Sequence, residues 1–106
     1  KRGDTVVGIS AAGGAAYVAS ALKAAKEIGA TVIALTCNSD SLIASVSDIA
    51  IVTDTGEEVV TGSTRMKAGS AHKMVLNMIT TCSMIKLGKV YENMMINLKP
   101  TNICTV

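Results

Sequence analysis

The segment over residues 31–36 constrains the fold of this chain more than any other. It reads Thr-Val-Ile-Ala-Leu-Thr, an apolar run in which polar and apolar positions do not alternate. A strand without a polar side is buried on both faces, as in a parallel sheet covered by helices. Similar runs occupy residues 5–10 and 48–53. The sequence therefore predicts three buried strands of this kind.

Helical spacing separates the three runs. Apolar residues recur every three or four positions from Val18 to Ala25, which predicts a helix that ends near Gly29, with Lys23 and Lys26 on its solvated side. A short helix is expected over residues 42–46, and a long one over about 64–87. The tail from residue 91 has no clean period, and Pro100 prevents one helix from running through it. This alternation predicts an α/β fold, a doubly wound parallel sheet with helices on both faces.

Composition excludes several classes of function. Hydrophobic residues make up 49% of the chain and charged residues 17%, so the chain is not disordered. The net charge is only +2, with no basic block, and two Tyr are the only aromatic residues, so we expect no nucleic-acid partner. The longest uncharged stretch, residues 74–85, is too short to cross a bilayer, so we expect no membrane partner either.

The cysteines predict the cellular compartment of the chain, and its first residues predict that it is a fragment. Cys37, Cys82 and Cys104 are an odd set without a C-x-x-C pair, which predicts free thiols in a reducing cytoplasm and no metal site. The chain opens Lys-Arg-Gly-Asp without an initiator Met, and a strand begins almost at once. We therefore expect a fragment whose upstream elements are missing.

The loop over residues 10–15 is the first candidate for a binding site. In open α/β sheets, ligands bind where strands lead into helices. Ser10 and Gly13 belong to a tight small-residue turn whose free N–H groups and helix dipole suit a phosphate. The alternative is that the small residues only permit a close turn. The loop is not a dinucleotide fingerprint, and no acidic residue ends the next strand.

The loop over residues 57–67 is the second candidate. It gathers carboxylates, hydroxyls and cations around one helix start, with these candidates for substrate binding: Glu58, Ser63, Thr64, Arg65 and Lys67. Cations there oppose the helix dipole, which favours function over a merely capped and solvated helix start. For His72, the only histidine, a packed or hydrogen-bonded position is expected rather than a ligand contact.

The second loop carries a family resemblance. Residues 58–71, Glu-Val-Val-Thr-Gly-Ser-Thr-Arg-Met-Lys-Ala-Gly-Ser-Ala, closely resemble the signature of the bacterial N-acetylmuramic acid 6-phosphate etherases. Residues 72–78, 36–41 and 93–102 resemble the same family, so the likeness covers nearly the whole chain. A similar segment occurs in glucokinase regulatory protein, which leaves a non-catalytic sugar-phosphate-sensing module as the alternative. A degenerate module kept for folding or dimerisation is a third possibility.

The resemblance implies a partial sugar isomerase (SIS) domain over residues 1–106 and the carboxyl-terminal part of a lyase. Its reaction cleaves the lactyl ether of a phosphorylated amino sugar by proton abstraction, elimination of D-lactate and addition of water. It implies a cytoplasmic homodimer that acts in cell-wall recycling without metal or organic cofactor. The acid and base are expected upstream of Lys1, with Glu58 as a lesser candidate for a base.

The resemblance also places Ser10 and Gly13 on the phosphate loop. There the family carries a Ser-Gly-x-Thr-Pro pattern, whereas this chain has Ala-Gly-Gly-Ala-Ala over residues 12–16. Fewer hydroxyl donors remain, so weak phosphate binding is expected.

Overall fold

The computed structural model describes residues 1–97, which belong to two compact units that divide after Met74. In the first unit, β1 (Thr5–Ile9), β2 (Thr31–Thr36) and β3 (Ile49–Val52) form a parallel sheet in the order β1-β2-β3. The helix α1 (Ala16–Glu27) connects β1 to β2, and α2 (Leu42–Val46) connects β2 to β3. The predicted α/β fold with a parallel sheet is confirmed, and each strand falls within its predicted run.

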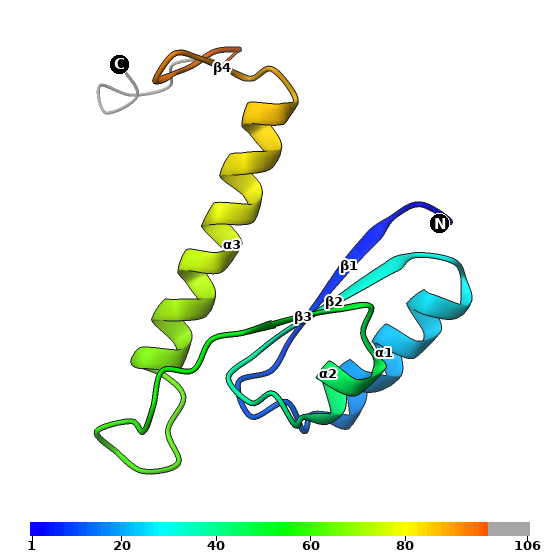
Figure 1. The fold of residues 1–106 in the computed structure, drawn as a ribbon, viewed down its shortest axis with the longest axis vertical. Helices are drawn as coiled ribbons and strands as arrows, with labels where there is room; N and C mark the ends of the chain where they lie inside the picture. Colours follow the sequence, from blue (N-terminus) through cyan, green and yellow to red (C-terminus); the bar gives the residue numbers. More distant parts are fainter. Residues whose placement is uncertain (98–106) are drawn as a thin grey trace. The chain divides into compact units, whose positions relative to one another are not determined.

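The helices α1 and α2 pack on one face of the sheet and on each other (Figure 1). Both connections step in the same direction across the sheet, so right-handed crossovers place both helices on that face. Leu35 alternates to the opposite face, where it is fully buried. Two residues further on, Cys37 contacts His72, which belongs to the first turns of α3 (Lys67–Lys86).

The core of the first unit lies between α1, α2 and the sheet. Its buried members come from both helices and the central strand: Val18, Ala19 and Leu22 of α1, Val32 and Ala34 of β2, and Ile43 of α2. A Cβ atom at Gly8 would lie 2.7 Å from Leu22 Cδ1, so α1 packs directly on the backbone of β1.

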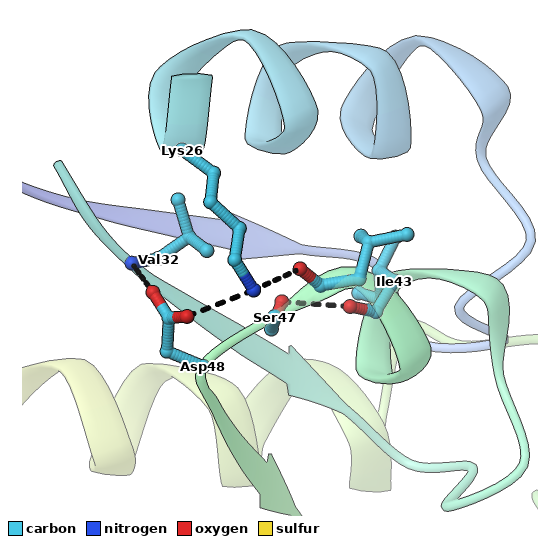
Figure 2. A network of polar contacts seen from close by, with 6 residues as sticks. Lys26, Val32, Ile43, Ser47 and Asp48 are labelled. Carbon is cyan, nitrogen blue, oxygen red and sulfur yellow. Dashed lines mark hydrogen bonds and ion pairs between the residues drawn. The ribbon is translucent and has the colours of Figure 1, made fainter. Parts of the chain in front are cut away.

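An ion pair lies beside this core, between the end of α1 and the residue before β3 (Figure 2). Lys26 Nζ lies 2.8 Å from Asp48 Oδ1 and donates to the Val46 carbonyl at 3.3 Å. The second Asp48 oxygen accepts from the Val32 N–H at 2.9 Å. The hydrogen bond from Lys26, followed by that from Val32, lowers the pKa of Asp48. Lys26 is exposed, as expected from the sequence, and it also takes part in this ion pair because α1 ends beside the turn that leads into β3.

The second unit contains the remainder of α3 and a short hairpin. The strands β4 (Val90–Tyr91) and β5 (Met94–Met95) pair antiparallel, with Glu92 at φ +52° in the turn. The sequence showed no clean period here, because two-residue strands are too short to display one. The predictions about Pro100 and Cys104 lie outside the described residues. None of the helices within residues 1–97 has the length and apolar character needed to cross a membrane.

Candidate functional site

The loop after β1 is joined to the loop after β2 by hydrogen bonds. The Ala11 carbonyl accepts from the Cys37 N–H at 2.9 Å and from the Thr36 hydroxyl at 3.1 Å. The Ile43 N–H, in the first turn of α2, donates to the Gly13 carbonyl at 3.1 Å. Because parallel strands end at the same edge of a sheet, the loops that follow them form one continuous rim.

Gly13 lies buried in this rim with a φ of +72°. A Cβ atom there would overlap Ser41, so both the backbone conformation and the space require glycine. The Gly13 N–H donates to Ser10 Oγ at 3.1 Å. The two predicted phosphate-loop residues therefore bind each other, and their part in phosphate binding stays a prediction.

Glu58 caps the start of α3. One carboxylate oxygen accepts from the Lys67 N–H at 3.1 Å, and the other accepts from the Ala68 N–H at 3.2 Å. The helix α3 begins at Lys67, three residues after the predicted start. Its first N–H groups bind Glu58, which lies nine residues earlier in the loop, so the residues next to the helix do not reveal the cap. The bond from Lys67 is the main cause that lowers the pKa of Glu58. A carboxylate held in this way is a weak proton acceptor.

The two cations of the second loop lie in different settings. Lys67 Nζ donates to the Glu57 carbonyl at 2.8 Å and so closes the loop on itself. Arg65 is exposed, and its N–H donates to Ser63 Oγ at 3.4 Å. Lys67 is thus largely used in holding the loop, whereas the guanidinium of Arg65 extends from an exposed position.

A pocket of about 350 Å³ opens at the carboxyl edge of the sheet. Loops from the ends of all three strands line it, together with the first turn of α3. The lining residues are Ala11, Ala12, Cys37, Asn38, 55–58, 61–64 and Ala68. This volume falls within the range of small-ligand sites, about 300–1,000 Å³. The loops that the sequence singled out therefore share one hollow.

The thiol of Cys37, which lines this pocket, contacts an imidazole and a hydroxyl that do not belong to the lining. Cys37 Sγ lies 3.5 Å from His72 Nε2 and 3.5 Å from Thr53 Oγ1. His72 is 7% exposed, and this burial lowers its pKa. The imidazole is therefore neutral at ordinary pH and packs inside the unit, as expected from the sequence.

The structure brings together only some of the candidate residues. Glu58, Ser63 and Thr64 line the pocket. Ser10 and Gly13 lie in the adjoining rim, and Arg65 and Lys67 lie outside the lining among the described residues. Sequence reasoning missed Cys37 and Asn38 as lining residues, although they directly follow a predicted strand, which is the signal that could have found them. In residues 1–97, no group of three or more His, Cys, Asp or Glu side chains is arranged to hold a metal ion.

Comparison with known proteins identifies relatives. The SIS domain family matches residues 1–82. The chain is 58% identical over 99 residues to an N-acetylmuramic acid 6-phosphate etherase of Oceanobacillus iheyensis, which covers 93% of this chain and 34% of that protein. It is also 58% identical over 99 residues to an etherase of the same name from Vibrio campbellii, of which it covers 32%. The chain thus spans about a third of the length of these relatives.

Proposed function

The chain belongs to the SIS domain family, and from this premise we propose that it is a phosphosugar-binding part of an N-acetylmuramic acid 6-phosphate etherase. Such a carbon–oxygen lyase cleaves the D-lactyl ether of its substrate and yields N-acetylglucosamine 6-phosphate and D-lactate. The identity to etherases over 93% of this chain supports the proposal. No metal or organic cofactor takes part in the proposed reaction.

The shared pocket is the observation that carries this proposal. Ala11 and Ala12 of the first loop line it together with the hydroxyl residues Ser63 and Thr64 of the second. Backbone N–H groups suit a phosphate, and hydroxyl groups suit the polar edge of a sugar. We therefore propose a phosphorylated amino sugar as the ligand, with the exposed Arg65 available to its anionic group.

The proposed reaction needs a base beside the sugar carbonyl and an acid at the lactyl oxygen. Glu58 suits neither role well, because both of its oxygens bind the start of α3 and its pKa is lowered. The relatives are about three times as long as this chain. We therefore propose that the acid and the base of the whole enzyme lie outside these 106 residues and that this chain by itself releases no lactate.

A titration of the isotope-labelled chain with N-acetylglucosamine 6-phosphate, followed by NMR, tests the binding proposal. We expect the amide signals of residues 11–12, 37–38 and 61–64 to shift, with an affinity weaker than micromolar because the first loop is rich in alanine. Ser63→Ala should weaken binding, whereas Ser45→Ala, on the exposed side of α2, is the matched control. Shifts confined to other residues would contradict the pocket assignment.

A D-lactate assay with N-acetylmuramic acid 6-phosphate tests the catalytic proposal. The 106-residue chain should give no lactate, and a protein that contains this sequence together with the remaining length of its relatives should give lactate. Turnover by the short chain would contradict an external acid and base. Sugar-phosphate binding without turnover in the longer protein would favour the sensing module instead.

We further propose a cytoplasmic homodimer for the whole protein. The free thiols of Cys37 and Cys82 support a reducing compartment. Exposed apolar side chains along α3, among them Met74, Met78 and Ile85, support a partner surface.

A further inference from the structure

A nucleophile on the pocket wall, Cys37, contacts a base, His72, and the proposed etherase function uses neither. Cys37 lines the pocket and is half-buried, with its sulfur 3.5 Å from His72 Nε2. A nucleophile and a base within hydrogen-bond reach are the usual signature of an activated thiol. The pair is therefore a candidate for chemistry on a molecule that enters this pocket.

Two polar groups contact the sulfur, the imidazole of His72 and the hydroxyl of Thr53. His72 is neutral because burial lowers its pKa, so Nε2 is free to accept a proton in the appropriate tautomer. Thr53 Oγ1, also 3.5 Å from the sulfur, carries a hydroxyl hydrogen that can turn toward a thiolate instead of the Thr36 carbonyl. Once the thiol proton has passed to His72, the imidazolium N–H and the Thr53 hydroxyl are both within reach of the sulfur.

We propose that Cys37 is a covalent modification site for small α,β-unsaturated carbonyl compounds, with His72 as the acceptor of the thiol proton. The sulfur proton passes to His72 Nε2, and the sulfur forms a bond to the β-carbon of the electrophile. The carbon–carbon π pair becomes an enolate, which takes the proton back from His72 at the α-carbon. The adduct retains every atom of both reactants, so the step requires no oxidant and no leaving group.

The adduct would lie inside the pocket that we assign to the sugar phosphate. Because Cys37 and Asn38 lie on the lining, a carbon chain on the sulfur would occupy part of its 350 Å³. The inference rests on the geometry of Cys37 and His72, so its failure would leave the proposed function untouched.

The rates at which two cysteines of the same chain react with acrylamide test the proposal. Cys82 is exposed on α3 and serves as the internal reference. Cys104 lies outside the described residues, so all proteins carry Cys104→Ser. Peptide mass spectrometry should show that Cys37 reacts at least about tenfold faster than Cys82 in the native chain, despite its lower exposure. In denaturing guanidinium chloride the two rates should become equal. A native Cys37 rate equal to or below that of Cys82 would overturn the proposal.

His72→Gln isolates the role of the imidazole. We expect the Cys37 rate to fall about tenfold while the Cys82 rate and the circular dichroism spectrum stay unchanged. An unchanged Cys37 rate in a folded variant would overturn the assignment of His72 as proton acceptor. If the variant does not fold, the native and denatured rates of the parent chain still decide the proposal, since they require no substitution at His72.

Discussion

Two adjacent glycines at the carboxyl edge of the sheet differ in how far they tolerate substitution. Gly13 combines a positive φ with a position against Ser41, and both its N–H and its carbonyl are hydrogen-bonded. The neighbouring Gly14 has open space at its Cβ position and no positive φ. The two glycines therefore have different structural roles although they are adjacent in sequence.

Gly13→Ala should destabilise the chain by about 2 kcal/mol or more, because the new methyl group overlaps Ser41 and the residue must keep a left-handed backbone. Urea unfolding followed by circular dichroism measures this change. Gly14→Ala is the matched control and should alter the free energy of unfolding by less than about 0.5 kcal/mol. Equal effects of the two substitutions would show that the Gly13 turn is not under this constraint.

Glu58→Gln should destabilise the start of α3 at neutral pH, because the amide carries no charge to bind the Lys67 and Ala68 N–H groups. The native pKa of Glu58 is lowered, so its contribution is present above the ordinary glutamate pKa and is lost as the pH falls through the native value. Amide hydrogen exchange at residues 67–70 should therefore speed up in the variant at neutral pH. The difference from the parent chain should shrink in acid, and a difference that grew there would contradict the cap.

At the scale of elements, the ion pair of Lys26 and Asp48 joins the end of α1 to the connection between α2 and β3. Asp48 also accepts from the N–H of Val32, so one carboxylate ties the end of α1 and the start of β2 to the residue before β3 (Figure 2). This arrangement fixes the position of α1 at the sheet edge opposite the pocket.

Asp48→Asn should lower the free energy of unfolding at neutral pH, because the amide loses the ion pair with Lys26. The lowered native pKa of Asp48 means that its stabilisation exists above the ordinary aspartate pKa and disappears as the pH falls through the native value. Urea unfolding at neutral and acidic pH should show the gap between variant and parent closing in acid. Lys26→Met should resemble Asp48→Asn, whereas Lys23→Met, on the exposed surface of α1, should have little effect.

At the scale of the whole molecule, a stripe of exposed apolar residues runs along α3. Met74, Met78 and Ile85 are each more than half exposed, at 55%, 58% and 53%, and their spacing of four and seven places them on one side of the helix. The outer strands β1 and β3 each pair on one side only within residues 1–97. Both features favour association with another chain.

The chain should therefore self-associate as its concentration rises, and Met78→Lys should weaken this association by placing a charge within the stripe. Ser83→Lys adds the same charge on the opposite side of α3 and is the control. Sedimentation velocity distinguishes these outcomes. A monomer at every concentration, or equal effects of the two lysines, would count against the stripe as a partner surface.

The sequence by itself determined the strands, the helices that separate them and the loops that line the pocket. It could do so because burial on both faces, helical spacing and small-residue turns depend on neighbours along the chain. Only the tertiary structure decided that Glu58 caps α3, that Lys26 pairs with Asp48 and that Cys37, on the pocket wall, contacts His72. Those contacts join residues 9 to 35 positions apart, and no local pattern records which distant side chain will arrive at a given atom when the layers pack.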